Sequence, residues 1–140
     1  MNLLFHVDSP AVADPGSEVE IQIALRKALK KRAPAVAFVA IPNGAQRTAW
    51  AAIKAKQEGL QKGFPDAVVL WPGGVAFPEL KTRSGSLDEA QHIWLNWLTK
   101  AGFNAGVFRA VNTCLWWLFD LGAPIDMTGL VRPVERSAAA

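Results

Sequence analysis

Apolar residues recur every three or four positions along residues 18–31, which is the spacing of one face of an α-helix. The apolar positions are Ile21, Ala24, Leu25, Ala28 and Leu29. Ser17 precedes this segment and Glu20 lies three residues later, so the pair is expected to form a capping box. At about 100° per residue, Glu18 falls at the edge of the apolar stripe and Glu20 on the solvent side. Glu18 can therefore reach a site at the sheet, although it also suits a simple partner for the helix dipole.

A second helical pattern covers residues 87–100. Its apolar positions are Leu87, Ala90, Trp94, Trp97, Leu98 and Ala101. Ser86, with Glu89 three residues later, predicts another capping box at the start of this helix. Gln91 lies on the inward flank of the apolar stripe, whereas His92 points the opposite way and is expected to be a solvated surface residue.

Four shorter runs rich in β-branched and other apolar residues are predicted to be strands, namely residues 35–41, 66–70, 75–81 and 105–110. Trp71-Pro72-Gly73-Gly74 separates the two middle runs and is typical of a hairpin turn. Residues 47–58 are expected to be helical, and Asn112 or Thr113 is expected to cap a short last helix. This order of elements indicates an α/β domain with a small mixed sheet. The helix between the last two strands implies a right-handed crossover.

The predicted hairpin carries three charged residues that can share one site. Glu79 and Lys81 lie two positions apart, so their side chains point to the same face of a strand. If the turn centres on Pro72-Gly73, Asp66 lies directly opposite Glu79, where two like charges repel each other. Lys81 offsets part of this repulsion and a divalent cation offsets more, since hard oxygen ligands suit Mg²⁺ or Mn²⁺. The spacing alone also fits a turn aspartate and an exposed charge pair on an edge strand.

Length and composition indicate one domain, because 140 residues, of which 51% are hydrophobic and six are Trp, can bury a single core. The net charge is only +3, yet eight basic residues and no acidic one lie between Ile21 and Gln57. The basic residues are Arg26, Lys27, Lys30, Lys31, Arg32, Arg47, Lys54 and Lys56. Such a block can bind phosphates. It also fits a solvated helix surface or the C-terminal end of a helix dipole, so charge permits a nucleic-acid partner without requiring one.

A membrane or secreted location is not expected. No apolar run approaches the roughly 20 residues that cross a bilayer, and the first seven residues have neither a basic start nor a cleavage-like site. The single cysteine, Cys114, cannot form an internal disulfide and is expected to be a buried residue in a protein of the reducing cytoplasm. One Cys and two His are too few for a structural zinc site, and His6 is given no role.

Two motifs resemble the core of the PD-(D/E)xK nuclease superfamily: Gly63-Phe64-Pro65-Asp66 and Glu79-Leu80-Lys81. The surrounding residues resemble more narrowly its virus-type replication-repair nuclease (VRR-NUC) family. The upstream matches to that family are Glu18, Gln22 and Asn43-Gly44. The downstream matches are the run from Ser84 to Gln91, then Trp94-Leu95, Leu98 and Gly102. The resemblance covers residues 17–120.

This resemblance implies a restriction-endonuclease-like αβββαβ core. The nuclease domain would cover residues 17–122, with residues 1–16 as an N-terminal segment and residues 123–140 as a C-terminal tail. The implied ligands of Mg²⁺ or Mn²⁺ are Asp66, Glu79, Glu18 and the carbonyl of Leu80. Lys81 would orient water or stabilise developing charge, and Gln91 would hold a phosphate or a water. Candidates for DNA contacts are Asn43, Arg47, Lys54, Lys62 and Arg83.

The resemblance also implies metal-dependent cleavage of DNA directed by its structure. Small free-standing members of the family resemble Holliday-junction resolvases that act as homodimers, and a two-fold dimer places one active site on each of two strands. Three alternatives stay open at this point: a flap or nicking endonuclease, a non-catalytic DNA-binding subunit, and a structural or toxin-related protein. The presence of Asp66, Glu79 and Lys81 together favours catalysis over binding alone.

Overall fold

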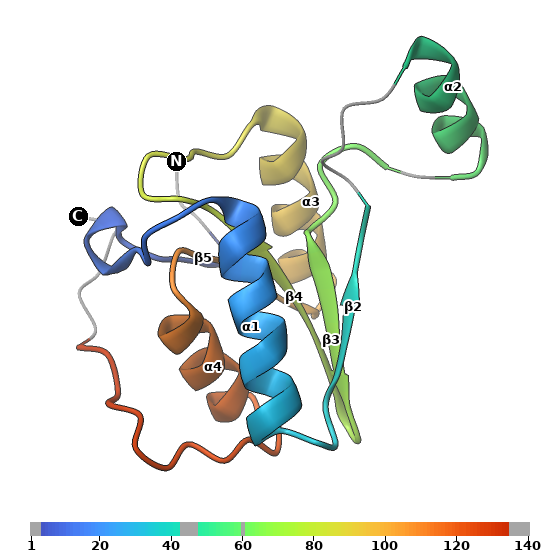
Figure 1. Cartoon of the computed structure of the whole chain (residues 1–140). Helices are drawn as coiled ribbons and strands as arrows, with labels where there is room; N and C mark the ends of the chain where they lie inside the picture. Colours follow the sequence, from blue (N-terminus) through green and yellow to red (C-terminus); the bar gives the residue numbers. More distant parts are fainter. Residues whose placement is uncertain (1–3, 43–47, 60, 135–140) are drawn as a thin grey trace.

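A single five-stranded sheet organises the fold (Figure 1). The computed structural model describes residues 4–42, 48–59 and 61–134. The strands are β1 (His6–Val7), β2 (Ala37–Ala40), β3 (Ala67–Trp71), β4 (Gly74–Leu80) and β5 (Asn104–Phe108). The helices are α1 (Glu18–Arg32), α2 (Ala49–Gln57), α3 (Glu89–Lys100) and α4 (Val111–Asp120), with a 3-10 turn at Pro10–Val12. The predicted α/β architecture with a small mixed sheet is confirmed.

The strands lie in the order β1-β5-β4-β3-β2. β2, β3 and β4 pair antiparallel, whereas β4, β5 and β1 pair parallel. The β3–β4 hairpin turns at Pro72-Gly73 as predicted, with Trp71 opposite Gly74. Gly73 has a φ of +90°, and a Cβ at Gly74 would lie 2.2 Å from the Trp71 indole. The two glycines therefore allow the tight turn and let the indole cross the end of the hairpin.

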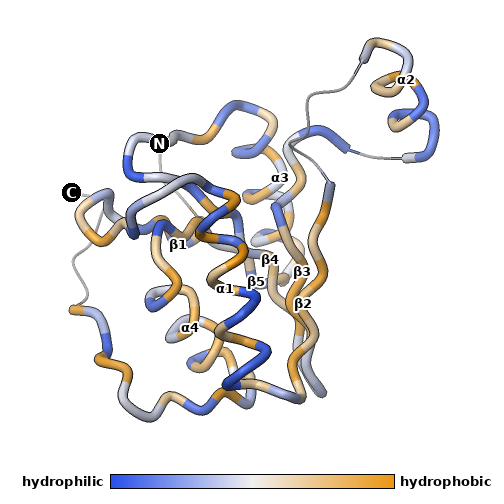
Figure 2. The backbone as a smooth tube through the Cα atoms, viewed as in Figure 1, coloured by the Kyte–Doolittle hydropathy of each residue, from blue (hydrophilic) through white to orange (hydrophobic). Residues whose placement is uncertain are grey.

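Helices cover both faces of the sheet. α1 and α4 pack on one face around a core that includes Leu25 of α1 and Leu115 of α4. α3 packs on the other face, where Leu95 meets Val107 of β5. Phe108, the next residue of β5, belongs to the core under α1 and α4, so β5 contributes alternate side chains to both cores. Figure 2 shows hydrophobic residues along the strands and α4. Burial of each such leucine side chain contributes roughly 2 kcal/mol to the stability of the fold.

The start of α1 agrees with the prediction made from its sequence. Ser17 is the N-cap and Glu20 completes the capping box with it. The buried positions of the helix are Ile21, Leu25 and Leu29, while Ala24 is exposed. The apolar stripe is therefore narrower than the sequence pattern suggests, because Ala24 faces solvent and Ala28 packs only partly against the core.

The start of α3 differs from the prediction, and the capping box expected from Ser86 and Glu89 is wrong. Asp88 is the N-cap and its carboxylate accepts from the backbone N–H of Gln91, whose side chain in turn accepts from the backbone N–H of Asp88. Asp88 and Ser86 are both favourable N-cap residues. Only Asp88 is followed three positions later by Gln91, whose side chain also donates a hydrogen bond to Glu79. The helix consequently begins two residues later than predicted.

The buried face of α3 also differs from the predicted stripe. Leu95 is fully buried, whereas Trp97, which was placed in the stripe, is 56% exposed. His92 is not a solvated surface residue, since it is partly buried and its ring packs against Phe5 with 6.1 Å between centroids. The cause lies in the N-terminal segment, which covers this part of α3 and which shows no periodicity in the sequence.

Residues 4–16 are built into the sheet and the core rather than lying apart from them. β1 pairs parallel with β5, with His6 opposite Gly106. Asp14 accepts a 2.8 Å hydrogen bond from the N–H of Val111 and so caps α4. The cap predicted at Asn112 or Thr113 is therefore wrong, because α4 starts earlier and its first N–H is satisfied from a distant part of the chain.

The described part of the C-terminal tail, residues 123–134, has no helix or strand, as expected, but it packs on the domain. Ala123 and Ile125 are buried in the core under α1 and α4. Arg32 donates to the carbonyls of Asp126 and Thr128, at 2.9 Å each, and holds the tail against the end of α1. Among the described residues, none of the helices combines the length and hydropathy that crossing a membrane would require.

Candidate active site

The two carboxylates predicted to face each other lie at the end of the sheet where β4 stops. The hairpin pairs Val69 with Ala76, and the same register continued along the strands sets Asp66 opposite Glu79, as predicted. Asp66 comes directly before β3, and its Oδ2 accepts a 2.9 Å hydrogen bond from the backbone N–H of Leu80. That bond fixes the Asp66 side chain across the strand from Glu79.

Glu79 is almost completely enclosed, with 1% of its surface exposed. Its Oε1 accepts a 3.1 Å hydrogen bond from the Gln91 amide, but none of the described residues donates to its Oε2. Burial, and then the neighbouring Asp66 carboxylate, raises the pKa of Glu79 to about 9, against a smaller opposing effect of Lys81. Without a further cation, Glu79 is therefore protonated at neutral pH. Ionisation of Glu79 would set two negative charges against each other, and a bound cation would relieve that repulsion and occupy the oxygen that has no donor.

Lys81 brings a buried ammonium group into the same site. Its Nζ lies 3.7 Å from Glu18 Oε1 and 4.0 Å from Glu79 Oε1. Glu18 therefore faces the site, as its position at the edge of the α1 stripe predicted, and it reaches the site from a half-exposed position. Glu20 instead bonds Ser17 and belongs to the helix cap.

Gln91 is held at both ends of its amide. Its Oε1 accepts from the backbone N–H of Asp88 at 3.0 Å, and its Nε2 donates to Glu79. The same residue thus caps α3 and orients the buried carboxyl group. The expected inward position of Gln91 is confirmed, while its expected contact with a phosphate or a water stays a prediction.

Gly63 explains why the chain can approach this site so closely. It has a φ of +85°, and a Cβ at this position would lie 2.5 Å from the carbonyl carbon of Ala90 in α3. Only glycine satisfies both conditions. The next residue, Phe64, anchors the segment through edge-to-face contacts with Phe77 and Trp94. Residues 63–66 are thereby packed against the first turn of α3, next to Gln91.

Arg109 is a buried residue near the site that sequence reasoning missed. Its guanidinium group donates to the carbonyls of Thr82 and Gly85, in the loop that directly follows Lys81. Asp8 holds Arg109 in turn, because its carbonyl accepts from Nε and its carboxylate accepts from the backbone N–H. The only signal in the sequence is a charged residue at the end of a predicted buried strand, and that signal does not identify its partners.

Comparison with known proteins places this geometry in a family. A family model described as the VRR-NUC domain matches residues 17–112, which is more than half of the chain. The chain belongs to the VRR-NUC domain family. A solved structure described as a VRR_NUC domain protein is also similar, with a TM-score of 0.59 and 18% sequence identity over 76% of this chain and 88% of that chain. At this identity the likeness shows the fold, and no curated protein matches the sequence.

Membership of the VRR-NUC family makes the protein a member of a nuclease superfamily, with nucleic acid as the expected substrate class. The donor set fits a hard divalent cation, since two facing carboxylates lie together and one buried oxygen lacks a donor among the described residues. The described residues contain no group of three or more His, Cys, Asp or Glu side chains arranged around one point. An ion at this VRR-NUC site would therefore keep several water ligands, as Mg²⁺ commonly does.

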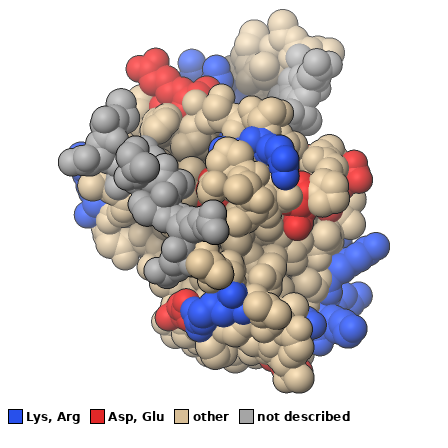
Figure 3. Space-filling view, turned by 90° about the vertical axis from the view of Figure 1, so that its left-hand side faces the viewer, with Lys and Arg blue, Asp and Glu red and all other residues tan. Residues whose placement is uncertain are grey.

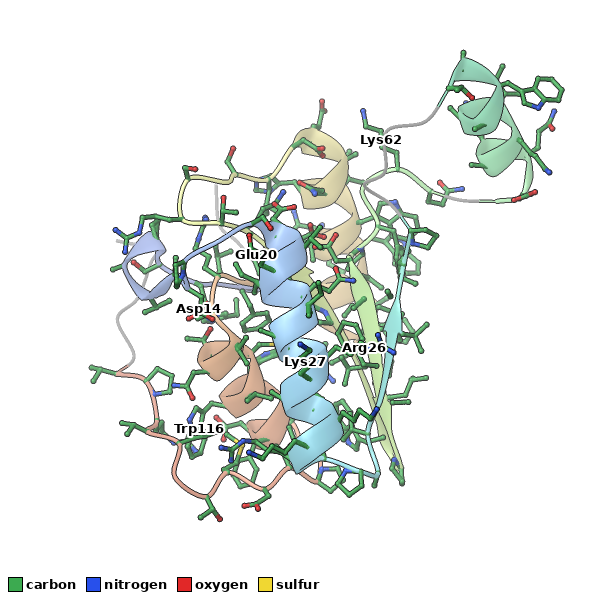
Figure 4. The ribbon with its side chains drawn as sticks, viewed as in Figure 1. Asp14, Glu20, Arg26, Lys27, Lys62 and Trp116 are labelled. Carbon is green, nitrogen blue, oxygen red and sulfur yellow. The ribbon has the colours of Figure 1, made fainter. Side chains whose placement is uncertain are left out.

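The predicted DNA-contact residues of the VRR-NUC domain are only partly described. Asn43 and Arg47 lie outside the described residues. Lys54, Lys62 and Arg83 are all exposed. Lys54 belongs to α2, and Figure 4 shows Lys62 at the end of the sheet from which α2 projects.

The basic residues of α1 lie away from this end of the sheet. Lys30, Lys31 and Arg32 form the last turn of the helix, roughly 18 Å along its axis from Glu18. Figure 4 shows Arg26 and Lys27 part of the way down the same helix. On the face drawn in Figure 3, Lys and Arg side chains form separate groups rather than one stripe. The described residues of the basic block are therefore divided in space between α1 and α2.

Proposed function

We propose that this protein is a divalent-metal-dependent DNA endonuclease that hydrolyses phosphodiester bonds in branched DNA, in the manner of a Holliday-junction resolvase. The observation that carries the proposal is Glu79, a buried carboxyl group with one unsatisfied oxygen, directly opposite Asp66. Such a pair costs stability in a protein that only binds DNA, because Glu79 must either take up a proton or face the Asp66 charge with little solvation. A site that recruits Mg²⁺ or Mn²⁺ gives the pair a role.

The ion would be held by Asp66, Glu79 and the carbonyl of Leu80, with Glu18 close by. When bound, it supplies Lewis-acid chemistry, which polarises the scissile phosphate and lowers the pKa of water. Lys81, already drawn toward Glu18 and Glu79, stabilises charge on the phosphate as attack proceeds. Gln91 keeps Glu79 oriented through its amide.

We further propose that the enzyme acts in the cytoplasm as a two-fold homodimer. A chain of 15.1 kDa with one such site can cut one strand, and a symmetric pair addresses two strands of a four-way junction. The family resemblance supports this assembly. A buried free thiol at Cys114 fits a reducing compartment.

The test compares a four-way junction, a 5′ flap, a nicked duplex and a linear duplex of matched sequence, each with Mg²⁺, Mn²⁺ or EDTA. Junction cleavage is expected with either metal and not with EDTA, and Asp66→Asn and Glu79→Gln are expected to abolish it. Glu89→Gln is the matched control, because Glu89 is an exposed carboxylate in the first turn of α3. Cleavage by Asp66→Asn at the wild-type rate would refute the site.

The same assay decides between the alternatives. Faster cutting of the flap or nicked duplex by a monomer would make the protein a flap or nicking endonuclease with the same metal chemistry. Tight junction binding without cleavage in any metal would make it a DNA-binding subunit. Light scattering of the wild-type protein measures the oligomeric state independently of cleavage.

A further inference from the structure

The chain between β2 and β3 makes an excursion that begins and ends at the candidate active site. The backbone N–H of Ile41, just after β2, donates a 2.8 Å hydrogen bond to the carbonyl of Asp66. Asp66 itself is where the chain returns to enter β3. Between these two points, α2 stands clear of the rest of the domain (Figure 1, upper right). Residues 48–59, here called the α2 arm, thus belong to a connection whose ends meet at the backbone of Asp66, the residue that supplies one of the two facing carboxylates.

One side of the α2 arm is unusually apolar for an exposed surface. Trp50 is 76% exposed and Ile53 is 53% exposed. At about 100° per residue, these two side chains share one face of the helix with Lys54, whereas Ala55, the buried residue of the helix, lies on the opposite side. The arm therefore exposes its two large apolar side chains and buries only an alanine, the reverse of a helix that packs on its own core.

The charge around the α2 arm favours a nucleic acid as its partner. Among the described residues from 48 to 65, the basic side chains are Lys54, Lys56 and Lys62, and the single acidic one is Glu58. All four are exposed. Exposed aromatic residues interleaved with lysines are typical of surfaces that hold a phosphate backbone and stack on bases. An apolar surface that docks a second protein is, by contrast, usually depleted of lysine.

We propose that the α2 arm binds the branched DNA substrate beside the active site. Lys54 in the arm and Lys62 just after it contact phosphates, while Trp50 and Ile53 pack on the base pair left unstacked at the branch point. This inference rests on the proposed function and deepens it, because it identifies the residues that tell a branch from a continuous duplex. A linear duplex exposes the faces of base pairs only at its two ends, so along its length only its phosphates meet the arm.

The experiment measures equilibrium binding of a labelled four-way junction and of a linear duplex in EDTA, together with single-turnover cleavage in Mg²⁺. Trp50→Ala is expected to weaken junction binding about tenfold and to change duplex binding less than twofold. Trp50→Phe is expected to restore most of the loss, since a phenyl ring still stacks. Lys54→Ala is expected to weaken both ligands equally and to reduce the salt-dependence slope by about one.

Trp97→Ala is the matched control, because Trp97 is also an exposed tryptophan (56%) but lies in the second half of α3. It is expected to leave junction binding unchanged. Equal junction binding by wild type and Trp50→Ala, in a protein that cuts junctions, would overturn the inference while leaving the proposed function standing. Dissociation of a wild-type dimer by Trp50→Ala would also overturn it and make the α2 arm a subunit contact. A wild-type protein that binds no DNA would refute both proposals.

Discussion

Replacing Glu79 by glutamine is predicted to make the metal-free protein more stable, and increasingly so as the pH rises. The pKa of this carboxyl group is about 9 in the folded protein, mainly because of burial and then because of the Asp66 carboxylate, against an ordinary value of 4.5. In the unfolded chain the group loses its proton near pH 4.5, whereas in the folded protein it keeps the proton until about pH 9. Folding must therefore take up a proton across this interval, and stability falls as the pH rises through it.

The size of this effect on the free energy of unfolding follows from the shift in the pKa of Glu79. One pKa unit corresponds to about 1.4 kcal/mol, so at pH 7 the burial of Glu79 costs about 3 kcal/mol relative to a neutral side chain. Below pH 4.5 the carboxyl group is protonated in both states and the cost vanishes, and above about pH 9 it stops growing. Glutamine is neutral throughout and its amide oxygen can still accept from Gln91, so Glu79→Gln removes the pH-dependent cost and keeps the hydrogen bond.

Urea unfolding of wild type and Glu79→Gln at several pH values between 5 and 8.5, in EDTA, measures this difference. The gap between the two is expected to widen by about 1.4 kcal/mol per pH unit. Glu89→Gln serves as the control, and its difference from wild type is expected to stay constant. Mg²⁺ is expected to stabilise wild type more at higher pH, because a carboxylate ligand must be deprotonated, and to leave Glu79→Gln unaffected.

A gap between wild type and Glu79→Gln that does not change with pH would refute the reasoning. It would mean that Glu79 is already ionised in the folded protein, with Lys81 as its permanent partner. Glu79 would then be half of a buried ion pair, and the argument that its environment demands a cation would fail.

Three further outcomes are expected. Glu18→Gln should lower the cleavage rate at least tenfold, whereas Glu20→Gln should cost only a fraction of a kcal/mol in urea unfolding, because Glu18 approaches Lys81 and Glu20 caps the helix. Gly63→Ala should destabilise the fold by roughly 1–3 kcal/mol and reduce cleavage, since its positive φ and its contact with α3 both exclude a side chain. Cys114 should resist thiol reagents in the folded protein and react in urea, because burial raises the pKa of its thiol.

Local rules of the sequence were enough for the central part of the site. The turn at Pro72-Gly73 fixes the register of the hairpin, and strict alternation along the strands then sets Asp66 opposite Glu79. The phase of α1 likewise distinguishes Glu18, which faces Lys81, from Glu20, which caps the helix. These features depend on residues that lie a few positions apart or are joined by one tight turn. The spacing of the residues in the sequence is therefore enough to predict them.

Local rules failed where a distant segment decided the outcome. The start of α3 moved to Asp88, whose partner Gln91 also bonds Glu79 across the fold. The ring of His92 packs against Phe5 instead of facing solvent. The carboxylate of Asp14 accepts a hydrogen bond from the first N–H of α4. Each choice was between side chains that are about equally good locally, so long-range contacts determined which one the fold uses.

The sequence by itself determined the hairpin, the principal helices and the pairing of the two carboxylates, because short-range geometry and the period of each element specify them. Only the tertiary structure decided that Asp8 would hold Arg109 against the loop after Lys81, a contact between residues about a hundred positions apart. It also decided that the described residues of the basic block would be split between α1 and the α2 arm. The physical reason is that burial and charge act through space, so a property that depends on what lies opposite a residue appears only once the chain has folded.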